Sequence, residues 1–140
     1  MKTIVSFFGL CILISGACTD RDVLDRKPGV SLPRVNNLVL EETGEKSVLL
    51  RWEIPSNLPA EIVQPVNVFI QVSQIASPTS AVPVFSIMLP DAPSEFSYEV
   101  PETGKTYHIT VKLNGKTKNT DRNYSSDIYS EGQTVVYSPE

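Results

Sequence analysis

The chain has 140 residues, of which 12 are Lys or Arg and 16 are Asp or Glu, so its formal net charge is −4. A mildly acidic chain lacks the basic face that nucleic-acid binding requires, and it is equally unsuited to electrostatic attachment to a membrane. Its two cysteines and single histidine leave no Cys/His ligand set and no Cys–His catalytic pair. We therefore expect no nucleic-acid partner and no metal site.

The N-terminal segment has the pattern of a secretory signal. Lys2 precedes an apolar run from Ile4 to Ile14, which is too short to span a bilayer because spanning requires about 20 residues. The small residues 15–17 follow, and Cys18 comes directly after them. No other stretch is apolar enough to cross a membrane.

Small residues ahead of a cysteine, after an apolar run, resemble the lipobox of bacterial lipoproteins, although Ser15 stands where that family prefers an aliphatic residue. The resemblance implies that residues 1–17 are removed and that Cys18 carries a covalent lipid. Two or more acyl chains anchor a protein stably. The expected location is the outer membrane of the cell envelope, facing the periplasm or the cell surface. The alternative is ordinary secretion after a small-x-small cleavage site, with Cys18 as a free thiol.

Residues 18–33 comprise the lipidated cysteine and a predicted flexible tether, which is charged first and then contains proline and glycine. At ~3.3 Å per residue such a tether reaches at most about 50 Å. Residues 34–138 then form one domain of ordinary size. Apart from the lipid, no cofactor is expected.

The domain is predicted to be all-β. The chain has 11 prolines, and apolar and polar residues alternate between them with a period of two, which is typical of strands. Turn residues separate these segments, so we expect a single seven-stranded antiparallel β-sandwich. The predicted strands cover residues 37–42, 47–53, 66–73, 84–89, 96–100, 107–113 and 133–137.

Two segments resemble the fibronectin type III family. Residues 32–55 contain a proline-led first strand and a second strand that ends in W-x-x-P, at Trp52 to Pro55. Residues 100–115 are similar to the family's E-to-F segment, with Tyr107 as the corner tyrosine and one extra residue before it. The resemblance implies a fibronectin type III-like sandwich. Trp52 and Tyr107 are in phase with apolar neighbours and are predicted to lie in the core. The whole-chain architecture is similar to small surface lipoproteins of Gram-negative bacteria, some found beside glycan-uptake systems.

No pattern in the domain indicates catalysis. Glu41, Glu42 and Glu45 lack the D-x-D-x-D spacing of a calcium loop and straddle a turn, so we expect them to be solvated. His108 has no acidic neighbour and is predicted to be an exposed strand residue. No G-x-S-x-G and no phosphate loop occur. A carboxylate pair for glycoside hydrolysis is defined by its separation in space, which a sequence does not give. We expect a protein that is not an enzyme.

The polar stretch from Asn114 to Gly132 is predicted to be a long loop between the last two strands and the site of recognition. Long loops inside compact domains are often functional. In the resembled family the F–G loop is a frequent binding site. The candidate binding residues are Arg122, Tyr124 and Tyr129, because tyrosine and arginine dominate contact hot spots.

The sequence thus predicts a non-catalytic, membrane-anchored lipoprotein that displays a fibronectin type III-like module to a protein partner or a surface complex. One alternative is a carbohydrate-binding accessory lipoprotein of a glycan-uptake system, with Tyr124, Tyr129 and Phe69 as the exposed aromatics. The other alternative is a structural subunit of an assembly.

Overall fold

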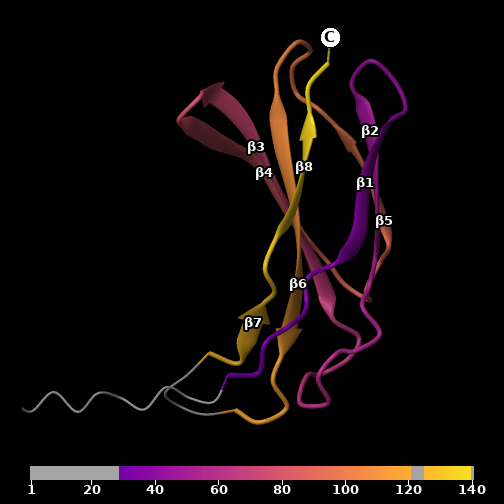
Figure 1. Ribbon diagram of the computed structural model, residues 1–140, viewed down its shortest axis with the longest axis vertical. Coiled ribbons are helices and arrows are strands. Elements are labelled where there is room, and N and C mark those ends of the chain that lie inside the picture. Colours follow the sequence, from indigo (N-terminus) through magenta and orange to yellow (C-terminus); the bar gives the residue numbers. More distant parts are fainter. Residues whose placement is uncertain (1–28, 121–124, 140) are drawn as a thin grey trace, which may run out of the picture.

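The computed structural model describes residues 29–120 and 125–139, which form two β-sheets packed face to face (Figure 1). The smaller sheet has the order β1-β2-β5, and the larger has the order β4-β3-β6-β7 with β8 also paired to β6. Every strand pair is antiparallel, so the predicted all-β sandwich is confirmed. The strands are β1 (Asn36–Glu42), β2 (Ser47–Glu53), β3 (Asn67–Ser77), β4 (Ser80–Leu89), β5 (Glu95–Glu99), β6 (Tyr107–Lys116), β7 (Asp127–Tyr129) and β8 (Gln133–Tyr137).

The predicted number of seven strands is wrong, because the described residues form eight. The additional strand, β7, pairs with the last part of β6, on the same edge that β8 occupies further along. Tyr129 and Gln133 are four residues apart, whereas their partners Asn114 and Val111 are three apart, so a bulge separates β7 from β8. Of the loop predicted from Asn114 to Gly132, residues 114–116 belong to β6 and residues 127–129 to β7.

The β3–β4 hairpin is longer than predicted and projects beyond the rest of the sandwich (Figure 1). Pro83, which was expected to precede the fourth strand, lies within β4. The strand register shifts at this point, between Pro83 and Phe85. Proline is tolerated there because β4 is an edge strand, and an edge residue whose N–H faces solvent contributes no bond to the ladder.

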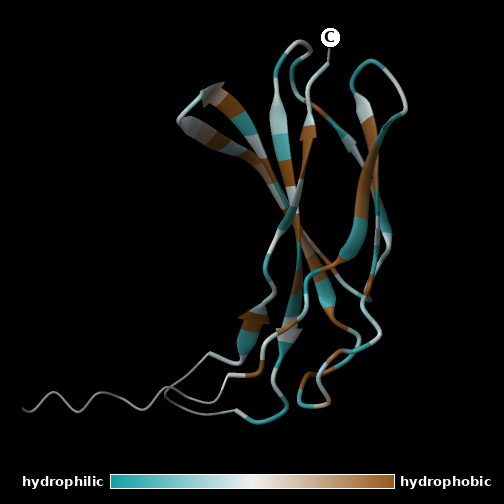
Figure 2. Cartoon of the chain, in the orientation of Figure 1, coloured by the Kyte–Doolittle hydropathy of each residue, from teal (hydrophilic) through white to brown (hydrophobic). Residues whose placement is uncertain are grey.

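The core lies between the sheets and follows the alternation of the strands. The strands carry both brown and teal residues in Figure 2, and buried positions alternate with less buried ones along β2 and most of β3. Trp52 is 3% exposed and Tyr107 is fully buried, which confirms the predicted core positions of both. The remaining fully buried large side chains are Tyr137, Leu50, Ile62, Ile70, Ile109, Leu113, Val35, Val48, Val66, Val68 and Val72.

Packing begins before the first strand. Leu32 is 3% exposed, and Val30 packs against the core, although both residues fall in the range predicted as tether. Leu32 lies close to Gly115, at the end of the sandwich where β7 is found and opposite the C-terminus (Figure 1). Within the described residues, no helix has the length and apolar character needed to cross a bilayer.

Candidate binding surface

The structure describes one of the residues that were predicted to bind a partner. Tyr129 lies at the end of β7, and its side chain is 52% exposed. It therefore belongs to a strand rather than to the loop in which it was expected. Cys18, Arg122 and Tyr124 lie outside the described residues.

Tyr129 and Phe69 form an exposed aromatic pair on the outer face of the larger sheet. Their ring centroids are 6.0 Å apart and the ring planes meet at 80°, which is a favourable edge-to-face geometry. Phe69 comes from β3 and is half-buried, while Tyr129 comes from β7, so β6 lies between them. The structure thus brings together two of the three aromatic residues that were considered for glycan binding.

A small cavity adjoins this aromatic pair. Its volume is about 150 Å³. Three of its neighbours are in register across the sheet, since Asn67 faces Asn114 and Asn114 faces Tyr129. We call this cavity the Asn114 pocket; it is lined by Val63, Pro65, Asn67, Asn114, Gly115 and Lys116.

Asn114, which lines the pocket, has an unused hydrogen-bond donor in its side chain. Asn114 is 3% exposed, and its Oδ1 accepts a hydrogen bond of 3.3 Å from Asn67 Nδ2. Its own Nδ2 is buried without a partner among the described residues. Leaving a buried amide donor unpaired costs about 1–3 kcal/mol, so a group that supplies an acceptor here is favoured.

Gly115 lines the pocket, and its lack of a side chain lets a neighbouring segment approach β6 closely. A Cβ at this position would lie 2.7 Å from Ile62 Cγ2 and 3.2 Å from Leu32 Cδ1. The segment that contains Ile62 can therefore approach β6 closely, and Val63 N–H donates to the Lys116 carbonyl at 2.8 Å. Val63 and Pro65 are held in this way as one wall of the pocket.

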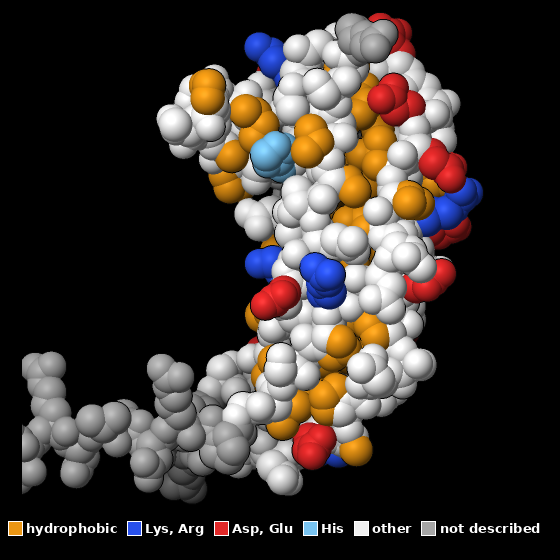
Figure 3. Space-filling view, viewed as in Figure 1, with side chains coloured by type: hydrophobic (Ala, Val, Ile, Leu, Met, Phe, Trp, Pro, Cys, Tyr) orange, Lys and Arg blue, Asp and Glu red, His pale blue; other side chains and the backbone are white. Residues whose placement is uncertain are grey.

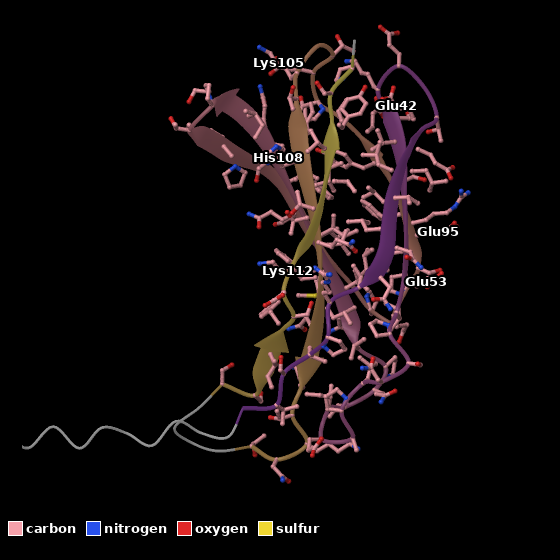
Figure 4. The ribbon with its side chains drawn as sticks, viewed as in Figure 1. Glu42, Glu53, Glu95, Lys105, His108 and Lys112 are labelled. Carbon is pink, nitrogen blue, oxygen red and sulfur yellow. The ribbon has the colours of Figure 1, made fainter. Side chains whose placement is uncertain are left out.

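Among the described residues, Lys116 is the one charged residue that lines the pocket. Lys116 faces Asp127 across the strand pair, while Lys112 faces Phe69. Acidic side chains are instead concentrated along the smaller sheet (Figure 3). In Figure 4, Lys112 projects from the larger sheet, whereas Glu53 and Glu95 lie beside the smaller one. The surface around the Asn114 pocket is thus mainly apolar and amide in character.

The residues that were judged unsuited to chemistry occupy the expected environments. His108 is exposed on β6, and Glu41 is exposed and forms a 2.7 Å ion pair with Arg51. Arg51 also lies 3.7 Å from Glu95. In the described parts of the chain, no group of three potential ligands is arranged to hold a metal ion.

The sequence did not indicate Asn67, Asn114, Val63 or Pro65 as site residues. Asn114 was predicted as the first residue of the long recognition loop, whereas it lies within β6. A polar residue that becomes buried through its cross-strand neighbour leaves no local signal, because its burial depends on a strand 47 positions away in the sequence.

Comparison with known structures gives the fold alone. A redesigned β-sandwich protein from a computational design study aligns with a TM-score of 0.50 at 14% identity, covering 76% of this chain and 89% of that chain. The fibronectin type III domain of human collagen XX aligns with a TM-score of 0.50 at 13% identity, covering 79% of this chain and 98% of that chain. The fibronectin type III-like fold is therefore confirmed.

Comparison with curated protein sequences finds no match. Comparison with family models finds a match over residues 18–137, to the family described as "Domain of unknown function (DUF4945)". The matched range includes every strand of both sheets. The chain accordingly belongs to the DUF4945 family.

Proposed function

We propose that this protein is a non-catalytic interaction module which a lipid on Cys18 holds at the outer membrane, and which binds a protein partner through the aromatic pair and the Asn114 pocket. The observation that carries the binding site is the unpaired Nδ2 of Asn114, a buried atom of a residue that lines the cavity beside two aromatic side chains. Exposed aromatic anchors beside a desolvated pocket are typical of contact hot spots.

The anchor is supported by the signal-like pattern of residues 1–17 and by the family match, which begins at Cys18. Since Val30 already packs against the core, the chain from Cys18 to the folded part reaches at most about 40 Å. The module is then confined close to the bilayer. Mass spectrometry of the mature N-terminus tests this part, and an unmodified Cys18 thiol on protein from the soluble fraction contradicts it.

The binding part is tested by co-purification of the full-length protein from its own membranes, with quantification of the proteins that accompany it. Tyr129→Ala is expected to lower partner recovery at least about tenfold, as loss of a hot-spot residue does. Val136→Ala is the matched control, because Val136 is 54% exposed in the same sheet. Equal recovery with both variants would contradict the assignment. Arg122→Ala and Tyr124→Ala test the two candidates in the neighbouring loop.

A second candidate function is binding of a neutral glycan at the same surface. It is favoured by the combination of the exposed Phe69–Tyr129 pair with the two amides of Asn67 and Asn114. Aromatic rings contact the apolar faces of sugars, and amides bind their hydroxyl groups. The volume of about 150 Å³ is below that of sites for drug-sized ligands, so it fits one ring or arm of a longer chain.

A glycan array followed by calorimetric titration of the hits distinguishes the two functions. The informative variant is Asn114→Asp, which replaces the Nδ2 donor with an acceptor of the same shape. We expect it to weaken binding of a neutral sugar roughly tenfold, as does loss of a good hydrogen bond at a desolvated site. The control is Asn119→Asp, which makes the same charge change at an exposed position. An array without signal removes this candidate and leaves the protein-binding proposal in place.

A further inference from the structure

The edge strand β4 has no charged side chain. In the described part of the sheet, β4 pairs with β3 on one side and has no strand on the other. From Ile62 to Pro90 the sequence contains no Asp, Glu, Lys, Arg or His, although the chain as a whole has a net charge of −4. In Figure 3 the tip of the β3–β4 hairpin is accordingly orange and white.

The other edges of the described sheets are protected from pairing with strands of other chains. Glu41 and Glu42 end β1, Glu95 and Glu99 bound β5, and Asp127 begins β7. The uncharged strand β8 lies next to β1 (Figure 1). Native proteins use such charges and covers to prevent edge strands from pairing with other chains. β4 is the longest of these edge strands and has neither protection.

The backbone of β4 directs free hydrogen-bonding groups at the open edge. Ile75 N–H donates to the Thr106 carbonyl at 2.9 Å, so Ile75 directs its backbone groups toward β6. Since these directions alternate along a strand, Ile70 and Val72 direct theirs toward β4. Their partners there are Ile87 and Phe85.

Ser86 and Met88 must therefore direct their N–H and C=O groups away from β3, toward the open edge. Val84 and Met88, each 39% exposed, lie two positions on either side of Ser86. Pro83 has no N–H and limits the pairing segment to Val84–Leu89. This segment carries no charge, is exposed at every second residue and is long enough to pair with another strand.

We propose that β4 pairs antiparallel with β4 of a second copy of this chain, around a two-fold axis at Ser86. In this register Ser86 faces Ser86 of the second copy, and Val84 faces Met88 of the second copy. Two-fold dimers are the commonest oligomers, and their interfaces are self-complementary in this way. The charges also allow a second copy to bind. Each chain is net negative, and two copies that pair through β4 bring no like charges together, because this long edge strand has none.

Disulfide cross-linking of the full-length protein in detergent tests this register. Directly paired residues in an antiparallel ladder have Cα atoms about 5.5 Å apart, which a disulfide bridges. Ser86→Cys is therefore expected to form covalent dimers on mild oxidation. The matched control is Ser97→Cys, on the exposed face of the charged edge strand β5. The unsubstituted protein gives the background from Cys11 and Cys18. Equal dimer yields from both variants would overturn the proposal.

Sedimentation of the full-length protein tests the dimer without a cross-link. Ser86→Lys places two like charges opposite each other, so we expect the dimer dissociation constant to rise about tenfold or more. Ser97→Lys is expected to leave it unchanged, and thermal unfolding shows that both variants fold. The proposal would be overturned if the unsubstituted protein sediments as a monomer. It would also be overturned if Ser86→Cys forms disulfides only with a different protein and not with a second copy of this chain. Neither result affects the binding function proposed for Tyr129.

Discussion

The Tyr107 hydroxyl and the Glu102 backbone are joined by two hydrogen bonds. The hydroxyl donates to the Glu102 carbonyl at 3.2 Å and accepts from the Glu102 N–H at 3.1 Å. Tyr107 is fully buried at the start of β6, and Glu102 lies in the segment that crosses from the smaller to the larger sheet. This is the tyrosine corner of fibronectin-type sandwiches, and it forms despite the extra residue before the tyrosine.

We expect Tyr107→Phe to lower the free energy of unfolding by about 1–3 kcal/mol, because the Glu102 backbone loses both partners while the ring remains in place. Urea unfolding followed by Trp52 fluorescence measures the change. Tyr129→Phe is the control, since that hydroxyl is exposed, and it is expected to stay within about 0.5 kcal/mol of the unsubstituted protein. Equal effects of the two substitutions would show that the corner contributes nothing.

Gly115→Ala is expected to destabilise the domain by about 1–3 kcal/mol through overpacking, because its Cβ would lie 2.7 Å from Ile62 Cγ2. The same change should reshape the Asn114 pocket, since Ile62 immediately precedes its wall residue Val63. Gly44→Ala is the matched control, as its Cβ would have no neighbour closer than 3.6 Å. Thermal or urea unfolding of the two variants checks the difference.

Ser130→Ala is expected to cost about 1–3 kcal/mol and to weaken binding at Tyr129. Ser130 Oγ accepts the buried Leu113 N–H at 2.8 Å and donates to the Glu131 carbonyl at 3.0 Å. Without the Ser130 hydroxyl, the buried Leu113 N–H has no acceptor, and the contact between β6 and the segment that follows β7 is weakened. Hydrogen exchange at Leu113 measures the loss directly. Ser97→Ala, at an exposed position, should change neither quantity.

Stability is expected to fall in alkaline solution above pH 10. Burial raises the pKa of Tyr137 above its ordinary value of 10.0, and Glu42, Glu45 and Tyr107 raise it further. Burial also raises the pKa of Tyr98, with a contribution from Tyr107. As the pH rises, these two phenols therefore lose their protons first in the unfolded state. The folded state keeps its full stability relative to the unfolded state below pH 10, and this stability falls as the pH rises through the raised pKa values of the folded state.

This pH dependence is checked by urea unfolding at several pH values above 10. Tyr137→Phe removes one of the titrating groups and should make the fall in stability with pH less steep. Tyr129→Phe, which removes an exposed tyrosine, is the comparison. A slope unaltered by Tyr137→Phe would show that the Tyr137 phenol is not the group responsible.

The fold was largely predictable because its signals are local. The alternation of apolar residues identified every strand except β7, and it placed Trp52 and Tyr107 in the core. β7 was missed because its three residues include a single apolar side chain that faces inward, Ile128. What defines this strand is the ladder it forms with Gly115 and its neighbours, which no local pattern records.

The candidate site was predictable only in part. Tyr129 and Phe69 were predicted as exposed aromatic residues of a possible glycan surface, but their contact depends on the order of β3, β6 and β7 in the sheet. Asn114 was missed because burial of an amide is decided by what lies across the sheet. Pro83 led to a strand boundary because proline usually ends strands, whereas at an edge it can remain within one.

The position of Leu32 beside Gly115 has a consequence for how a ligand would arrive. The described chain begins at the end of the sandwich that carries Tyr129. Under the proposed lipid on Cys18, this end is the one tied to the bilayer, through a tether that reaches at most about 40 Å. A ligand at Tyr129 would then be bound on the tethered side of the domain, within that distance of the lipid headgroups.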